Sequence, residues 1–145
     1  MSKKDDFDLG VFLPYLLNQA AEESSLAFTQ LYKNKYGMLR TEWRVLFHLG
    51  SFGQMTATEI VDRAKIHKTK ISRAVQKLVE KRFVARERSE NDRRQENLIL
   101  TPSGSAAYED LSEVAREYDA RLCAKFTDEE VRLLRKMLRR LGELE

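Results

Sequence analysis

The chain has 145 residues, the length of one domain or of one domain with an extension, so two independent catalytic domains are excluded. Hydrophobic residues make up 42% and charged residues 34% of the sequence, a balance that is typical of a soluble globular protein and excludes intrinsic disorder. With only 6 Gly and 2 Pro, turn residues are scarce, which favours a mainly helical fold over an all-β sandwich.

No apolar run approaches the roughly eighteen residues that a membrane span needs, so no membrane partner is expected. The N-terminal residues lack the apolar core and cleavage site of a secretory signal, which predicts a cytoplasmic protein. The single cysteine, Cys123, cannot form an intrachain disulfide, and neither histidine has the spacing of a zinc ligand. We therefore expect no metal and no cofactor.

The basic charge is concentrated in one part of the chain. The net charge is only +3, but residues 63–94 contain twelve Lys or Arg against four Asp or Glu, so the remainder is net acidic. Such asymmetry favours a polyanionic partner, although a solvated surface would show the same composition.

The first predicted element is an amphipathic helix from Leu9 to about Lys35, in which apolar residues recur every three or four positions. Pro14 lies inside this pattern and either kinks the helix or marks its true start. After Gly37, Thr41 is the predicted N-cap of a second, short and heavily buried helix that closes at residues 50–53.

The capping box Thr56-Ala-Thr-Glu59 then opens a helix of about two turns, residues 58–64. A third helix of this group follows from about Lys68, with a continuous apolar face through Ile71, Val75 and Leu78. The opposite face is polar and cationic, and consists of Lys68, Lys70, Ser72, Arg73, Gln76 and Lys77.

Two short segments, residues 83–88 and 96–100, have a composition compatible with β-strands and are separated by a polar stretch, which predicts a β-hairpin with a charged tip. Thr101 and Pro102 form a helix start, because proline at the first helical position loses no hydrogen bond. The long helix that follows runs to about Lys125. A second capping box, Thr127-Asp-Glu-Glu130, starts the last helix.

The order of elements over residues 41–100 is that of a winged helix-turn-helix, so the predicted fold is mainly α with a small β-hairpin wing. The basic helix suits the major groove of duplex DNA, and a hairpin can place arginines in the adjacent minor groove. The flanking segments, residues 9–36 and 102–145, carry more apolar surface than this lobe can absorb, which predicts dimerisation helices. A two-fold homodimer would bind a pseudo-palindromic operator.

Two fragments of the sequence carry a family resemblance. Residues 92–104 resemble the wing signature of the MarR family of bacterial transcriptional regulators: Asp, any residue, Arg, then an apolar residue, any residue, Leu-Thr and Gly. Ile71-Ser72-Arg73, followed by Val75, Leu78 and Val84, resembles the recognition helix and first wing strand of that family.

The resemblance extends over nearly the whole chain and implies a homodimer whose wing arginine, Arg94 oriented by Asp92, contacts the minor groove. One residue departs from the family pattern. Arg82 stands where the family usually has a left-handed glycine at the end of the basic helix, which puts the end of that helix in doubt.

The predicted DNA-binding residues lie in the helix-turn-helix and in the wing. Each could instead belong to a solvated surface, but their order along the chain favours DNA contact. They are Thr56, Lys68, Thr69, Lys70, Ser72, Arg73, Gln76, Lys77, Arg88, Asp92, Arg93 and Arg94.

The resemblance also implies a small aromatic or phenolic acid as effector. The candidate effector-binding residues combine aromatic walls with one cation, and the alternative is that they are ordinary core residues; they are Phe28, Trp43, Arg44, Phe47 and His48. For Cys123, packing in the interior or in an interface is favoured over thiol-based sensing.

The leading hypothesis is a sequence-specific, dimeric DNA-binding transcriptional regulator, a repressor that the effector releases. One alternative is a winged-helix protein-interaction module with non-specific DNA affinity, and a less favoured one is a redox-sensing regulator that uses Cys123. No paired catalytic carboxylates, nucleophile elbow or phosphate-binding loop is present in the sequence, so an enzyme is not expected.

Overall fold

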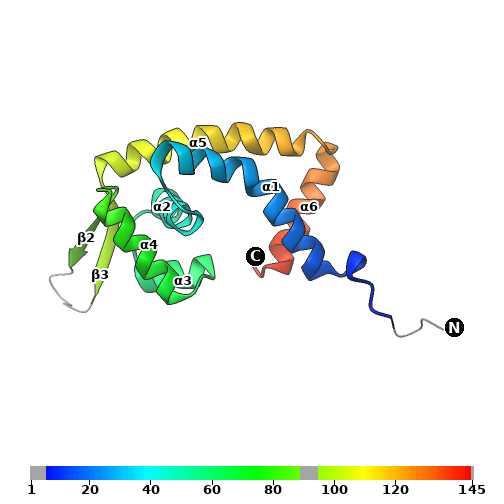
Figure 1. Ribbon diagram of the computed structural model, residues 1–145, viewed down its shortest axis with the longest axis horizontal. Helices are drawn as coiled ribbons and strands as arrows, with labels where there is room; N and C mark the ends of the chain where they lie inside the picture. Colours follow the sequence, from blue (N-terminus) through cyan, green and yellow to red (C-terminus); the bar gives the residue numbers. More distant parts are fainter. Residues whose placement is uncertain (1–5, 89–94, 145) are drawn as a thin grey trace.

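A computed structural model gives the structure of residues 6–88 and 95–144 (Figure 1). The predicted combination of a mainly helical fold with a small β-hairpin is confirmed. The elements are a 3₁₀ turn (Leu9–Val11), α1 (Leu13–Tyr36), α2 (Arg40–Phe52), β1 (Met55–Thr56), α3 (Ala57–Ala64), α4 (Lys68–Glu80), β2 (Val84–Arg88), β3 (Glu96–Leu100), α5 (Pro102–Cys123) and α6 (Asp128–Leu141).

The long helix α5 runs along most of the molecule, with α1 beside it (Figure 1). At one end α2, α3, α4 and the β-hairpin form a lobe, and at the other end α6 turns back from the end of α5. None of the helices in the described ranges is both long and apolar enough to cross a bilayer.

The sheet has three antiparallel strands in the order β1-β3-β2. In the hairpin Val84 is opposite Leu100 and Arg88 is opposite Glu96, as expected for the two predicted strands. The short strand β1 pairs Met55 with Leu98 and was not predicted, because two residues are too few to show a period in the sequence.

The hydrophobic core lies in the lobe and under the middle of α1 and α5. Its fully buried side chains come from the helices and strands of the lobe and from the residues that border them, and include Tyr32, Met38, Leu46, Ile60, Ile71, Leu78, Leu98 and Leu111. By contrast, α6 contains no buried residue. The two ends of the chain are therefore much less packed than its centre.

Of the two alternatives for Pro14, a kink within a helix from Leu9 or the true start of the helix, the second is confirmed. Residues 9–11 form a 3₁₀ turn, Phe12 is extended, and Pro14 is the second residue of α1. An α-helix that continued through Pro14 would lose a backbone hydrogen bond and clash with the preceding turn.

The predicted N-cap at Thr41 is wrong, because α2 begins at Arg40 and its cap is Leu39, two residues before Thr41. The carboxylate of Glu42 accepts a hydrogen bond from the Leu39 backbone N–H at 3.3 Å. This contact satisfies the donor at the helix start, so the threonine hydroxyl is not needed there.

The three other predicted threonine caps are confirmed. Thr56 accepts from the Glu59 N–H at 3.2 Å, Thr101 from the Gly104 N–H at 3.0 Å, and Thr127 from the Glu130 N–H at 3.1 Å. The first of these helices starts at Ala57, one residue before the predicted boundary.

The β-hairpin and the start of α5 are in close backbone contact. The Phe83 carbonyl accepts a hydrogen bond from the Thr101 N–H at 3.0 Å. A Cβ atom at Gly104 would overlap the same carbonyl, so only glycine allows this approach.

Arg82 adopts the left-handed conformation, with φ of 64°, between the end of α4 and β2. Its carbonyl accepts a hydrogen bond from the Thr101 hydroxyl at 2.6 Å. The family's usual glycine would take this conformation without the Cβ strain that arginine incurs.

We therefore expect Arg82→Gly to have a free energy of unfolding about 1 kcal/mol higher than that of Arg82→Ala. Both variants remove the same exposed side chain, but only glycine relieves the left-handed strain. Urea denaturation at one fixed protein concentration measures the difference, and equal stability of the two variants would contradict the strain argument.

Candidate DNA-binding site

Helix α4 has one buried face and one exposed face. Ile71, Ala74, Val75 and Leu78 are buried in the core of the lobe. All seven α4 residues predicted to bind DNA are exposed on the other side, and they are Lys68, Thr69, Lys70, Ser72, Arg73, Gln76 and Lys77. The helix thus presents a polar, cationic surface of the kind that fits a DNA major groove.

The start of α4 is capped by a histidine. The ring nitrogen Nδ1 of His67 accepts a hydrogen bond from the Thr69 backbone N–H at 3.2 Å. This contact gives His67 a structural role and leaves the hydroxyl of Thr69 on the exposed face.

Two further predicted DNA-binding residues, Thr56 and Arg88, lie outside α4. The Thr56 hydroxyl is occupied as the cap of α3, and Arg88 is exposed at the end of β2. Asp92, Arg93 and Arg94 are outside the described residues. Their predicted contacts with DNA stay predictions.

An arginine that sequence reasoning missed connects the wing to α4. The guanidinium of Arg86 lies 2.9 Å from the Glu96 carboxylate on β3 and also donates to the Gln76 side-chain oxygen at 2.9 Å. The Gln76 amide in turn donates to Glu80 at 3.2 Å. These bonds set the position of the wing relative to the exposed face of α4, and no local sequence pattern indicates them.

Comparison with known proteins assigns this arrangement to a family. A model of the MarR family matches residues 36–95. The HTH-type transcriptional regulator YwoH of Bacillus subtilis is 28% identical over 95 residues, 66% of this chain and 69% of YwoH. A MarR/EmrR family regulator from Acinetobacter sp. ADP1 has a TM-score of 0.80 and 27% identity, covering 96% of this chain and 100% of that chain. The helix-turn-helix and the first wing strand of this chain thus match the MarR family, and its fold is that of solved MarR family regulators.

A further solved structure, that of BpsR from Bordetella bronchiseptica, has a TM-score of 0.84 and 19% identity, and covers 94% of this chain and 96% of that chain. Its DNA binding is regulated by 6-hydroxynicotinic acid. The family match and the fold are those of winged-helix, DNA-binding transcriptional regulators, a class of proteins that is not enzymatic.

Three of the five candidate effector-binding residues lie together in an aromatic cluster. The Trp43 ring centroid is 5.2 Å from that of Phe28 and 4.8 Å from that of Phe47, and Tyr32 stacks on Trp43 at 5.6 Å. Within the described ranges, the Trp43 indole nitrogen Nε1 is buried and has no hydrogen-bond partner. Phe28 itself is a core residue.

The other two candidates are bonded to backbone carbonyls. Arg44 donates to the Ala64 carbonyl at 2.9 Å, and its pKa is lowered by burial and by the nearby charge of Arg40. The His48 ring nitrogen Nδ1 lies 2.6 Å from the Arg44 carbonyl. The Arg44 guanidinium, the cation expected to pair with an acid, is therefore bonded to the C-terminal end of α3.

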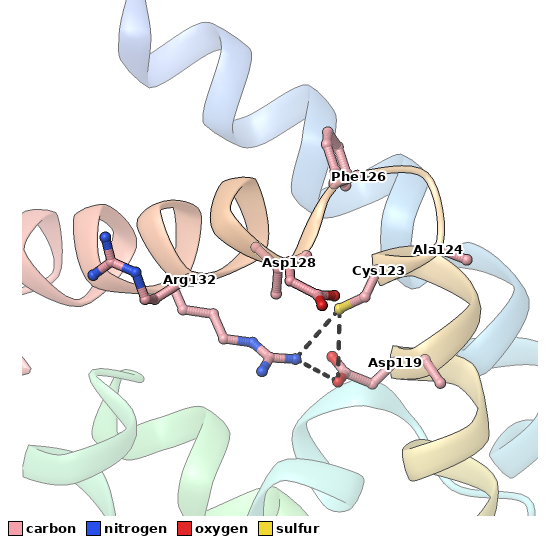
Figure 2. Close-up of a pocket in the computed structure, with 9 residues that line it drawn as sticks. Asp119, Cys123, Ala124, Phe126, Asp128 and Arg132 are labelled. Carbon is pink, nitrogen blue, oxygen red and sulfur yellow. Dashed lines mark hydrogen bonds and ion pairs between the residues drawn. The ribbon is translucent and has the colours of Figure 1, made fainter.

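Cys123 lies in a cavity of about 660 Å³ between the end of α5 and α6 (Figure 2). The Arg135 guanidinium is 3.3 Å from its sulfur and 2.7 Å from the Asp119 carboxylate. Cys123 is half-buried, so the single chain does not bury it fully. The predicted packing role would require a partner that fills this cavity.

A buried ion pair holds the end of α4 against the junction of α1 and α2. The Glu42 side chain is 4% exposed, and its carboxylate lies 2.8 Å from the Lys81 ammonium. Lys81 also donates to the Gly37 carbonyl at 2.8 Å. A buried carboxylate needs such a partner, because an unpaired buried charge is costly.

We expect Lys81→Met to lower the free energy of unfolding by roughly 2–3 kcal/mol. The effect is smaller than for a fully buried pair because Lys81 is partly exposed. Lys77→Met on the same helix is the matched control, since the Lys77 ammonium is exposed and 3.8 Å from Glu80, and we expect it to change stability by less than about 0.5 kcal/mol. Equal destabilisation by the two variants in urea denaturation would contradict a special role for Lys81.

Proposed function

We propose that this protein is a homodimeric repressor of the MarR family that binds a pseudo-palindromic operator and is released by a small aromatic acid. The observation that carries the proposal is the exposed face of α4, where seven polar or cationic side chains lie opposite a fully apolar face. A helix of this kind, attached to a wing, matches the geometry that major-groove recognition requires.

Under this proposal α4 enters the major groove and Arg73 and Lys77 contact bases or phosphates. The wing, with Arg88 and the predicted Asp92, Arg93 and Arg94, contacts the minor groove. The N-terminus of α3, capped by Thr56, presents backbone N–H groups to a phosphate. Residues 41–100 then form the DNA-binding lobe.

Residues 9–36 and 102–145 supply the dimer interface under the same proposal. Large apolar side chains are exposed at both ends of the single chain, and they include Leu9, Phe12, Leu13, Leu16, Leu134, Met137, Leu138 and Leu141. An exposed apolar surface of this extent is typical of an interaction site, and a second copy of the same surface covers it with two-fold symmetry.

Fluorescence anisotropy tests the proposed function directly. The protein is titrated into a labelled duplex that contains the intergenic region upstream of its own gene and, separately, into a scrambled duplex. Both titrations are repeated at several salt concentrations. The proposal requires tighter binding to the upstream duplex and a steep decrease of affinity with salt. Equal and weak binding to both duplexes would favour the protein-interaction module instead.

We expect Arg73→Ala to reduce the ratio of operator to scrambled affinity, because a base contact carries about 1–3 kcal/mol of discrimination, about one order of magnitude or more. Arg116→Ala, an exposed arginine on α5, is the matched control and is expected to leave the ratio unchanged. If Arg73→Ala weakens binding to both duplexes equally, Arg73 contacts a phosphate.

The effector is proposed to bind at the aromatic cluster of Phe28, Trp43 and Phe47. The buried Trp43 N–H lacks a partner within the described structure, and an acid's carboxylate or phenol oxygen would accept a hydrogen bond from it. Arg44 and His48 directly follow Trp43 and Phe47 on α2, and Arg44, which donates to the Ala64 carbonyl, is the proposed cation for the carboxylate. The effector of BpsR, a hydroxylated aromatic acid, is an example of this ligand class.

We expect Trp43→Phe to bind the operator as tightly as the unchanged protein but to require about tenfold more aromatic acid for release, because the ring stacking stays and one hydrogen bond to a charged group is removed. The measurement is operator release by salicylate and 6-hydroxynicotinate. Phe52→Leu, an exposed aromatic change on the same helix, is the control. Identical release curves for Trp43→Phe and the unchanged protein would place the effector elsewhere.

A further inference from the structure

Helix α6 carries a cationic face that the proposed dimer interface does not use. Because successive residues of a helix are separated by about 100°, the basic residues of α6 gather on one side and the leucines on the other. The cations are Arg132, Arg135, Lys136, Arg139 and Arg140, and all are exposed. We propose that the C-terminal half of this face, formed by Lys136, Arg139 and Arg140, is a second contact surface for the phosphate backbone of the operator duplex.

The five cations differ in their partners. Arg132 is 2.6 Å from the Glu129 carboxylate and Arg135 is 2.7 Å from the Asp119 carboxylate. Within residues 6–88 and 95–144, no ion pair is formed by Lys136, Arg139 or Arg140. These three cations at the C-terminal half of α6 are therefore available to an external anion.

A favourable interaction with the helix dipole would explain only two of these three cations. Arg139 and Arg140 lie in the last turn of α6, where positive charge is favourable in any helix. Lys136 precedes that turn and gains little from the dipole. A continuous stripe that includes Lys136 indicates a surface directed at a polyanion.

The C-terminal end of α6 lies against the DNA-binding lobe. The Lys65 ammonium donates a hydrogen bond to the Gly142 carbonyl, and Lys65 is the cap between α3 and α4. Figure 1 shows the C-terminal end of the chain near α3. The cations of α6 are thus brought toward the N-terminal end of the helix proposed to enter the groove, and phosphates recur every few ångströms along the adjoining backbone.

A basic amphipathic helix is also typical of peptides that lie on anionic membranes. Duplex DNA is favoured here because the leucine face of α6 is assigned to the dimer interface and is then not available for insertion into lipid. The bond with Lys65 further ties α6 to the DNA-binding lobe. The inference rests on the proposed function and extends the DNA surface beyond α4 and the wing.

The test compares the triple variant Lys136→Gln, Arg139→Gln, Arg140→Gln with the matched control Arg132→Gln, whose guanidinium is already paired with Glu129. Glutamine retains the helix propensity of lysine and arginine and leaves the leucine face unchanged. Lys136→Gln alone tests the stripe without altering the last turn. Light scattering and circular dichroism verify the dimer mass and the helicity.

We expect the slope of log K against log salt to become shallower by about 0.9 for each phosphate that the variant no longer neutralises, with the operator and the scrambled duplex affected alike. Arg132→Gln is expected to leave the slope unchanged. Arg73→Ala, by contrast, changes the ratio of the two affinities, so the two surfaces are distinguished by different measurements.

An unchanged slope for the triple variant, with Arg73→Ala still lowering discrimination, overturns the α6 surface and leaves the proposed function standing. Binding to a membrane is tested with vesicles of phosphatidylserine and phosphatidylcholine. If the triple variant loses vesicle binding while its salt slope on DNA is unchanged, the proposal that α6 contacts DNA is also overturned. Absence of operator preference in the unchanged protein overturns the proposed function itself.

Discussion

The position of the helix proposed to contact DNA depends on one buried ion pair. Glu42 lies in the core of the lobe and its carboxylate is paired with Lys81 at the end of α4. The same carboxylate caps the start of α2 through the Leu39 N–H, and Lys81 also reaches the Gly37 carbonyl. One pair of charges therefore joins the end of α4 to the junction of α1 and α2, and the buried Glu42 carboxylate needs this partner because an unpaired buried charge is costly.

Backbone contacts hold the segment that follows α4 in place. The wing begins after the left-handed residue Arg82, and its first strand is joined to the start of α5 by the Phe83–Thr101 backbone bond and the close approach at Gly104. Further along, the Tyr36 hydroxyl donates to Asp110 at 2.6 Å, and burial together with this carboxylate raises the pKa of Tyr36 to about 12. These contacts connect α1 and α5 with the end of α4 and the wing.

The two faces of α6 give this helix two roles in the proposed assembly. Its leucines are exposed in the single chain and are suited to an interface with a second copy, whereas its cations lie on the opposite side. The cavity beside Cys123 lies where α5 meets α6, so it belongs to the part of the chain that a partner would cover. In the proposed assembly the regulator is thus incomplete as a monomer, and its DNA surface extends across the dimer.

The sequence by itself determined the order of the helices and of the two hairpin strands, the caps at Thr56, Thr101 and Thr127 and the cationic face of α4, because periodicity and capping depend on residues within a few positions of each other. Only the tertiary structure decided that Glu42 moves the start of α2, that Arg86 joins the wing to Gln76 and that the Trp43 N–H is buried without a described partner. The Glu42 cap is local, but it depends on the burial of this carboxylate beside Lys81. Arg86 and Gln76 belong to different elements, and the state of the Trp43 N–H depends on packing. Aromatic residues of a core and of a ligand site recur with the same helical period in a sequence, so only their packing in the structure distinguishes the two roles.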